Sequence, residues 1–142
     1  MGRAMTRPER EAFLAEVRVG VVSVVTDDGH GPLAVPMWYG YAPGGEVMLI
    51  TPRDSRKARL IRLAGRYSLC VQAAEPPYRY VSVEGPVTAI AESVTADERR
   101  ALARRYLGDE EGDRYVGSSA GATARMISIR MRPERWLSDD QS

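Results

Sequence analysis

The strongest chemical signal in this sequence is a group of cations placed between a predicted strand and a predicted helix. Residues 47–51 form a short apolar run that Pro52 ends, and apolar residues at helical spacings from Ser55 onward predict an amphipathic helix. Asp54 or Ser55 is suited to cap this helix. The basic residues around its start are Arg53, Arg56, Lys57 and Arg59.

This crowding of cations predicts a phosphate site. A helix N-terminus already carries about +0.5 charge, so each cation in its first turn is unfavourable by roughly 0.3–1 kcal/mol unless an anion binds there. Free backbone N–H groups, a hydroxyl from Thr51 or Ser55 and two or three cations would together hold a phosphate. Lys57 is also the only lysine among 20 basic residues. The alternative is that the arginines of an arginine-rich chain simply lie in solvent.

Length and composition fit one ordinary globular domain. The chain has 142 residues, 44% of them hydrophobic, and we expect an ordered core of about residues 6–137. The net charge of +1 gives no electrostatic argument for nucleic acid. Without a leader or an apolar run of about 18 residues, we expect no membrane span and a cytoplasmic location. Cys70 lies in an apolar run and is predicted to be a reduced core residue.

The side chains offer few other catalytic groups. His30 is the only histidine and lies in a predicted turn, so we expect it to be exposed. With one histidine and one cysteine, neither a zinc site nor a Ser-His-Asp or Cys-His arrangement is expected. There is no Gly-rich dinucleotide motif and no P-loop. If the protein is an enzyme, a bound cofactor is expected to carry the reaction.

The elements that position these residues are mostly strands. Strands are predicted at 19–26, 33–41, 47–51, 67–73, 79–90 and 125–131, and helices are predicted to begin near Thr6, Ser55 and Thr95. Six strands joined mainly by hairpins, with three helices at the connections, predict an all-β fold with helical insertions, namely an antiparallel barrel. The first strand is nearly all β-branched and is predicted to be buried.

Several connections carry their own predictions. Pro36 has no backbone N–H to donate to a neighbouring strand, so we expect its strand to lie at a sheet edge, to contain a bulge or to be approached by a ligand. Gly85-Pro86 predicts a bend in the long strand, so that one strand serves two parts of the sheet. Residues 75–77 are predicted to be a rigid, extended connector and residues 117–124 a flexible loop. The arginines of the helix after Thr95 are expected to be solvated, and the tail after Leu137 to fray.

Two stretches resemble a known superfamily. The run Leu-Ile-Thr-Pro-Arg-Asp-Ser-Arg-Lys-Ala-Arg-Leu, residues 49–60, is similar to the flavin-phosphate segment of the pyridoxamine 5′-phosphate oxidase superfamily. The run Arg-Tyr-Val-Ser-Val-Glu-Gly, residues 79–85, is similar to a strand of the same superfamily. The resemblance covers about residues 10–137. It implies a six-stranded antiparallel split β-barrel of the FMN-binding type, with Greek-key-like connections.

Within this superfamily, the sequence more closely resembles the branch that uses the deazaflavin cofactor F-420. The Pro-x-Trp-Tyr of residues 36–39, the Ser-Arg-Lys of residues 55–57 and the run Glu-Pro-Pro-Tyr-Arg-Tyr-Val from Glu75 carry this resemblance. It implies a homodimer with cofactor sites at the interface and hydride transfer between F-420 and a small conjugated or heteroaromatic substrate. The cofactor-binding residues it implies are Pro36, Met37, Trp38, Thr51, Arg53, Ser55, Arg56 and Lys57.

Roles beyond the phosphate are less defined. Tyr78 and Tyr80 would line the pocket or donate a proton, from the same chain or from the second subunit. Two alternatives stay open: an FMN-binding oxidoreductase of the same superfamily, and a non-catalytic protein that binds a flavin-like cofactor. No metal, nucleic acid or membrane partner is expected in any of the three.

Overall fold

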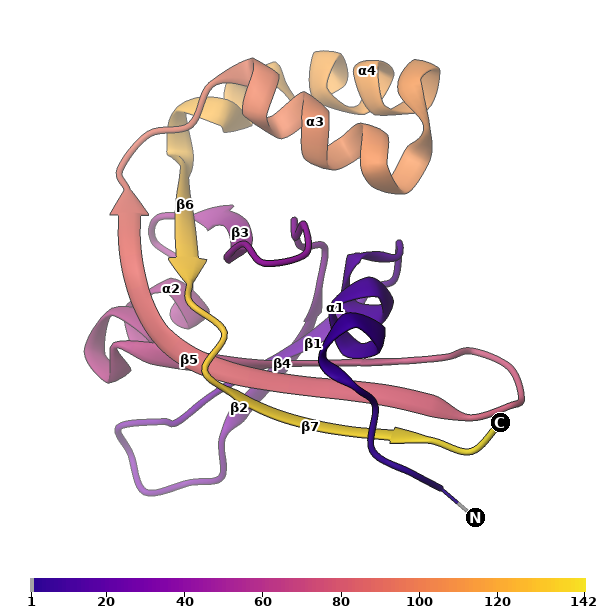
Figure 1. Cartoon of the computed structure of the whole chain (residues 1–142). Coiled ribbons are helices and arrows are strands. Elements are labelled where there is room, and N and C mark those ends of the chain that lie inside the picture. The colour runs from indigo at the N-terminus through magenta and orange to yellow at the C-terminus, as the bar shows by residue number, and fades with distance from the viewer. Residues whose placement is uncertain (1) are drawn as a thin grey trace.

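The computed structural model describes residues 2–142 and shows a split β-barrel with helical insertions (Figure 1). The strands are β1 (Gly20–Val24), β2 (Leu33–Met37), β3 (Val47–Pro52), β4 (Arg66–Gln72), β5 (Arg79–Ala91), β6 (Met126–Met131) and β7 (Arg135–Asp140). The helices are α1 (Arg7–Ala15), α2 (Arg56–Ala64), α3 (Ala96–Leu107), α4 (Asp109–Ser118) and the 3-10 helix η1 (Ala120–Arg125). The predicted fold class is confirmed, with a seventh strand, β7, beyond the six predicted.

Strand β5 holds the two parts of the sheet together. The strand order is β2-β1-β4-β5-β6-β3, with β7 also paired to β5, and every pair is antiparallel. The first half of β5 pairs with β4 and β7, and its second half curves away to pair with β6 (Figure 1). A Cβ atom at Gly85 would lie 1.8 Å from the carbonyl oxygen of Arg132, so the bend requires glycine there. The predicted bend at Gly85-Pro86 is confirmed.

The core lies inside the curled sheet, because alternate side chains of each strand point inward. Leu69 and Val71 of β4 are buried, whereas Cys70 between them is exposed. The prediction that Cys70 is a core residue is therefore wrong. Strand β1 alternates in the same way, and Val21 on its outward face is 43% exposed. The prediction of a fully buried β1 is wrong for the same reason: only one face of the sheet packs on the core.

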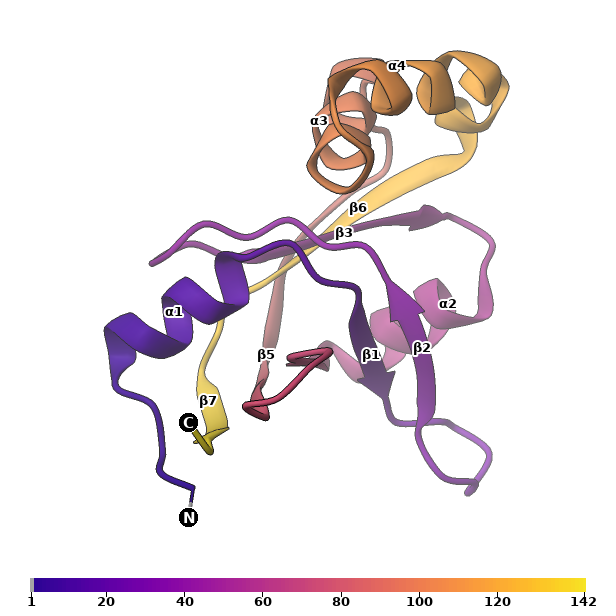
Figure 2. The ribbon, with the colours of Figure 1, turned by 90° about the vertical axis from the view of Figure 1, so that its right-hand side faces the viewer.

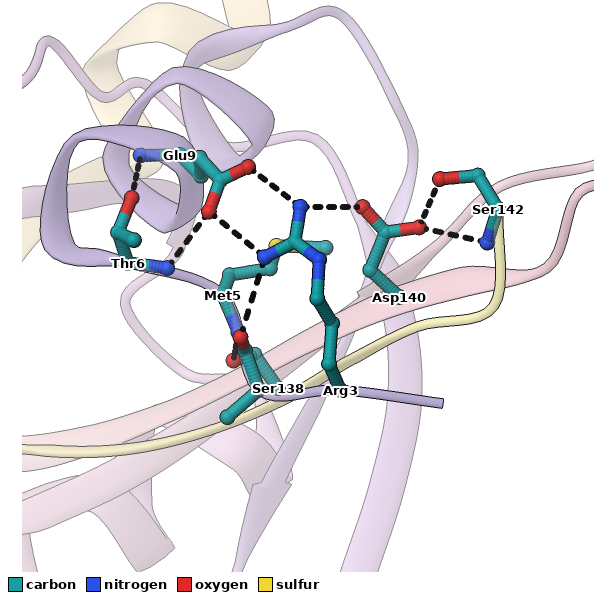
Figure 3. Close-up of polar contacts among 8 residues, drawn as sticks. Arg3, Met5, Thr6, Glu9, Ser138, Asp140 and Ser142 are labelled. Atoms are coloured by element: carbon teal, nitrogen blue, oxygen red, sulfur yellow. Dashed lines mark hydrogen bonds and ion pairs between the residues drawn. The ribbon is translucent and has the colours of Figure 1, made fainter. Parts of the chain in front are cut away.

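The two ends of the described chain are fastened to each other (Figure 3). Thr6 and Glu9 form the predicted capping box at the start of α1. The guanidinium of Arg3 donates to Glu9 at 2.8 Å and lies 3.6 Å from Asp140. Residue 3 also forms an isolated β-bridge with Asp140. The tail predicted to fray is therefore largely strand β7, which pairs with β5 along its whole length.

Helices α3 and α4 form an insertion between β5 and β6, and both views place them beside the same end of the barrel (Figures 1 and 2). The region predicted as a flexible loop, 117–124, is the end of α4 followed by η1. Glycines explain part of this error, since Gly112, Gly117 and Gly121 all argue against a helix from sequence. Here a Cβ at Gly112 would lie 2.7 Å from the Arg104 backbone nitrogen, so glycine permits the close packing of α4 on α3.

Two further connections complete the fold. Residues 75–77 belong to a bent hairpin that closes β4 onto β5, with a hydrogen bond from Ala73 N–H to the Arg79 carbonyl, so the predicted extended connector is wrong. Strand β2 lies at an edge of the sheet, as the presence of Pro36 predicts. Within residues 2–142, no helix has the length and apolarity that crossing a membrane requires.

Candidate functional site

A cavity of about 390 Å³ lies between the barrel and the α3–α4 insertion. Its lining comprises Val19, Pro36, Met37, Trp38, Ile50, Thr51, Pro52, Lys57, Arg99, Leu102, Tyr115 and Met126. The lining therefore combines the end of β2, the end of β3, the first turn of α2 and residues of the insertion. Five of the residues implied by the family resemblance meet here, namely Pro36, Met37, Trp38, Thr51 and Lys57.

The start of α2 brings Lys57 to the cavity. Ser55 is the N-cap, and its Oγ accepts the Ala58 N–H at 3.2 Å, so Lys57 lies in the first helical turn. The N–H groups of Arg56 and Lys57 have no intrahelical acceptor, because they belong to the first turn. Lys57 forms no ion pair with any carboxylate of residues 2–142. A free cation and free N–H groups at the positive end of a helix favour a bound anion.

The two hydroxyl groups near this turn have different surroundings. The Ser55 hydroxyl donates to the Pro52 carbonyl at 2.8 Å while it caps the helix, so it is committed to the turn. Thr51 is 1% exposed and its Oγ1 lies 3.4 Å from Ser55 Oγ. Thr51 lines the cavity, whereas Ser55 lies outside the lining and contacts Thr51.

The three arginines near Lys57 are paired away from the cavity. Arg53 donates to the Glu92 carbonyl at 2.6 Å, Arg56 lies 3.8 Å from Asp28, and Arg59 lies 2.8 Å from Asp27. The hydrogen bond from Arg59 holds the pKa of Asp27 below its ordinary value. These three arginines therefore have acceptors within the fold, and Lys57 is the cation of this group that lines the cavity.

An aromatic cluster closes one side of the cavity. The rings of Trp38 and Tyr106 stack with their centroids 5.0 Å apart and their planes 5° apart, and Tyr115 of α4 lies against Trp38 at 5.4 Å. The Tyr106 hydroxyl donates to the Arg18 carbonyl at 2.7 Å and accepts the Tyr39 N–H at 3.0 Å. These contacts hold α3 against the segment after β2, so one face of Trp38 is already occupied by protein.

Arg99 is a cavity residue that the sequence analysis missed. It was expected on a solvated helix face, but it is only 6% exposed. Its guanidinium donates to the Ser119 carbonyl at 3.0 Å, to Ser119 Oγ at 3.0 Å and to Thr123 Oγ1 at 2.9 Å. The signal in the sequence is its spacing, since Arg99, Leu102 and Ala103 form the buried stripe of α3.

The remaining candidate residues lie elsewhere. Tyr78, 60% exposed in the β4–β5 hairpin, and Tyr80, which faces Gln72 and Asp139 across neighbouring strands, do not line the cavity within this chain. His30 is exposed in the β1–β2 turn, as predicted. Within residues 2–142, no three histidine, cysteine, aspartate or glutamate side chains form a cluster suited to a metal ion.

The outward face of the β2-β1-β4-β5-β7 part of the sheet is not covered by any helix of this chain. The strand registers place one residue of each strand in a single row across this face: Pro36, Val21, Cys70, Ser82 and Leu137. Leu137 is 63% exposed and Val21 is 43% exposed. Pro36 also lines the cavity, so this row, which we call the outer row, begins at the cavity rim.

The structure combines an antiparallel split barrel with a cavity beside the strand–helix turn at Lys57. A family model described as pyridoxamine 5′-phosphate oxidase matches residues 6–138. The chain therefore belongs to the pyridoxamine 5′-phosphate oxidase family, whose name denotes an oxidoreductase.

Solved structures agree with this family in their fold. An F420 reductase superposes with a TM-score of 0.76 at 24% identity, covering 89% of this chain and 94% of its own. A conserved hypothetical protein from Mycobacterium tuberculosis gives a TM-score of 0.74 at 26% identity, covering 96% and 86%. A FAD-binding protein from Mesorhizobium loti gives a TM-score of 0.69 at 18% identity, and the superposition covers 100% of this chain and 99% of that protein's chain. A search of curated proteins finds no match.

Proposed function

We propose that this protein is an oxidoreductase that transfers a hydride between a deazaflavin cofactor, F-420, and a small conjugated or heteroaromatic substrate. The observation that carries the proposal is the position of Lys57, an unpaired cation at the first turn of α2 that lines the same cavity as Trp38. Membership of the family and the likeness in fold to an F420 reductase support it.

The residues of the cavity fit a phosphorylated, planar cofactor. Its volume of about 390 Å³ lies within the usual range of small-molecule sites. Lys57 and the free N–H groups of α2 would hold the phosphate, with Thr51 as a further hydroxyl partner. Met37 and Trp38 would form a wall for the ring, and Pro36 keeps that part of the edge strand free of an N–H group. Arg53, Ser55 and Arg56 would act from outside the cavity, by shaping the turn.

When bound, the deazaflavin supplies a hydride at C5 of its ring. The protein would contribute position and the exclusion of water, which is the usual contribution of the protein in a cofactor enzyme. No carboxylate and no histidine is present among the described residues that line the cavity, so a proton would come from water or from a tyrosine. Tyr78 and Tyr80 take this role only if they arrive from a second protomer.

A homodimer through the outward sheet face belongs to the same proposal. The outer row is apolar or small along its length and uncovered in the single chain. Val19 and Pro36 line the cavity at the edge of this face, so a second protomer packed there would complete the cavity wall. This arrangement would place two cofactor sites at the interface.

FMN is the second candidate cofactor, because the phosphate-binding features of α2 do not distinguish it from F-420. The FAD-binding relative has the same fold and supports this alternative. A non-catalytic protein that binds a flavin-like cofactor would use the same turn.

Calorimetric titration of the purified protein with F-420 and with FMN separates these candidates. We expect F-420 to bind more tightly than FMN, and reduced F-420 to be oxidised when enones or quinones are added. Tighter binding of FMN would replace the first candidate with the second. Tight F-420 binding without turnover on any acceptor would favour the non-catalytic protein, and failure to bind either cofactor would overturn the proposal.

A further inference from the structure

Arg99 is a buried cation that the protein does not neutralise. It is 6% exposed, and its three hydrogen bonds go to the Ser119 carbonyl, Ser119 Oγ and Thr123 Oγ1, all of them neutral acceptors. A guanidinium has five N–H donors, so these contacts leave part of its capacity unused. Burial of a charge without an opposite charge is strongly unfavourable unless something compensates it.

The acidic residues near Arg99 are all engaged elsewhere. Asp97 pairs with Arg100, Glu98 completes the capping box at Thr95, and Asp113 pairs with Arg104 at 2.7 Å. Within residues 2–142, no carboxylate lies in ion-pair contact with Arg99. The insertion therefore pairs Arg100 and Arg104 of α3 with carboxylates, whereas Arg99, the most deeply buried arginine of this helix, has only neutral acceptors.

The neutral contacts of Arg99 fix its direction. Ser119 and Thr123, at the start of η1 and within it, accept hydrogen bonds from the guanidinium, and Arg99 is among the residues that line the cavity. Tyr115, whose ring lies 5.8 Å from the Arg99 guanidinium carbon, lines the same cavity. A held, planar donor group at the wall of a cavity is suited to a carboxylate or phosphate, which accept two parallel hydrogen bonds.

The charge of the cavity points the same way. Its lining holds two cations, Lys57 and Arg99, and no carboxylate among the described residues. The two cations come from different elements, α2 of the barrel and α3 of the insertion. An anion bound by Lys57 and the free N–H groups at the start of α2 would neutralise Lys57. Arg99 would still be without a counter-charge.

We propose that Arg99 binds a second anionic group, a carboxylate or phosphate, on a molecule that occupies this cavity. This inference rests on the proposed function. The anionic group belongs either to the conjugated substrate, which is then an acid, or to the acidic side chain of the cofactor. Arg99 is in this view a specificity-determining residue that the insertion brings to the barrel.

The test compares ligands that differ only in charge. Cinnamate and cinnamamide have nearly the same shape, and calorimetric titration gives their affinities for the wild-type protein and for variants. We expect the wild-type protein to prefer cinnamate, Arg99→Gln to lose this preference by about tenfold or more, and Lys57→Ala to keep most of it. Arg100→Gln is the matched control, because Arg100 follows Arg99 on the same helix, pairs with Asp97 and lies outside the cavity lining.

A second arm identifies the cofactor as the source. The affinity of F-420 is compared with that of its ring-and-ribityl fragment, which lacks the phosphate and the carboxylates. If Arg99→Gln weakens F-420 alone and leaves the fragment and cinnamate unaffected, the anionic group belongs to the cofactor. If it weakens cinnamate alone, the group belongs to the substrate.

A structural role for Arg99 gives a different result. Thr123→Val removes one of its supporting hydrogen bonds and retains the cation, so it should keep the preference for cinnamate. If Arg99→Gln does not fold, the preference of the wild-type and Lys57→Ala proteins for cinnamate over cinnamamide still tests whether the cavity binds a second anionic group. Equal binding of cinnamate and cinnamamide by both, with no excess of F-420 over its fragment in Lys57→Ala, overturns the proposal. Failure of F-420 to bind the wild-type protein, with the cinnamate preference intact, would overturn the proposed function and leave the role of Arg99 standing.

Discussion

The indole ring of Trp38 and the phenol ring of Tyr106 stack in parallel, with their centroids 5.0 Å apart and their planes 5° apart. Trp38 follows β2, and Tyr106 lies near the end of α3, so this pair joins the barrel to the insertion. Tyr115 of α4, which lines the cavity, packs against Trp38 in a tilted orientation, with the ring planes 54° apart. The shape of the cavity therefore depends on how the insertion docks against Trp38.

The hydroxyl of Tyr106 should be important for this docking. Tyr106→Phe keeps the stacked ring but removes the donor to the Arg18 carbonyl and the acceptor of the Tyr39 N–H. We expect a loss of about 1–3 kcal/mol in the free energy of unfolding, measured by urea denaturation. Tyr115→Phe is the control, because the Tyr115 hydroxyl has no hydrogen bond among the described residues and the side chain is partly exposed. Equal stability of both variants would contradict the anchoring role.

Lys57 should dominate the binding of the phosphate. Lys57→Ala is expected to weaken cofactor binding by about 1.5–3 kcal/mol, the value of a charge-assisted hydrogen bond, as measured by calorimetric titration. Arg59→Ala provides the comparison, since Arg59 belongs to the same helix but pairs with Asp27 at 2.8 Å and lies outside the cavity lining. A larger effect from Arg59→Ala than from Lys57→Ala would place the phosphate elsewhere.

A charge on the outward sheet face should prevent dimerisation. Val21→Glu places a carboxylate in the outer row, between Pro36 and Cys70, where an apolar interface would bury it without a partner. By light scattering at micromolar concentration, we expect a dimer for the wild-type protein and a monomer for Val21→Glu. Leu63→Glu is the matched control, because Leu63 is 64% exposed on α2 and lies away from this face. A wild-type monomer would remove the basis for an interface site.

Cys70 reports on the same face without a change of charge. It lies next to Val21 in the outer row and is an exposed thiol in the single chain. If the face is covered in a dimer, a thiol reagent such as DTNB should modify Cys70 slowly in the wild-type protein and rapidly in Val21→Glu. Equally rapid modification of both proteins would show that the face is open in solution.

The contact between the chain ends should depend on pH. The hydrogen bond from Arg3, followed by that from the Thr6 N–H, lowers the pKa of Glu9 from 4.5 to about 2 (Figure 3). Because the pKa is lower in the folded state, the stabilisation is present above about pH 4.5 and is lost as the pH falls towards 2. The melting temperature of Glu9→Gln should therefore lie below that of the wild-type protein at pH 7 and approach it at pH 2.

The matched control for Glu9→Gln is Glu75→Gln. Glu75 is an exposed glutamate of the β4–β5 hairpin, and its substitution removes one negative charge without breaking an ion pair of the described residues. Melting temperatures of the three proteins across this pH range make the comparison. A constant difference between the wild-type protein and Glu9→Gln down to pH 2 would contradict the assignment.

Local patterns predicted much of the fold. The capping boxes at Thr6 and Thr95, the N-cap at Ser55 and the bend at Gly85 are all present, because each depends on residues close together in sequence. Strand β7 was missed since its second half, Ser138-Asp139-Asp140, is polar and resembles a tail, and only its pairing with β5 makes it a strand. Helix α4 was missed because Gly112 disfavours a helix in isolation, although packing on α3 requires it.

The site was predictable where chemistry and local geometry coincide. Lys57 and Thr51 were identified from a strand–turn–helix pattern, and both line the cavity. The partners of Arg56 and Arg59 were not foreseeable, because Asp27 and Asp28 reach them from a distant hairpin. Arg99 was misplaced for the same reason: its burial depends on how α3 packs, and on the contacts of Ser119 and Thr123 in a segment predicted to be a loop.

The insertion leaves β5 after Ala91 and returns to the barrel at Met126, close to Ser128, which faces Ala91 across the β5–β6 ladder. Its two ends are therefore neighbours in the sheet, and a change in the length of the intervening chain adds little to the entropy of loop closure. Variation in the length of the segment that carries Arg99 and Tyr115 therefore costs little chain entropy, provided that Tyr106 keeps its contacts with Trp38 and Arg18.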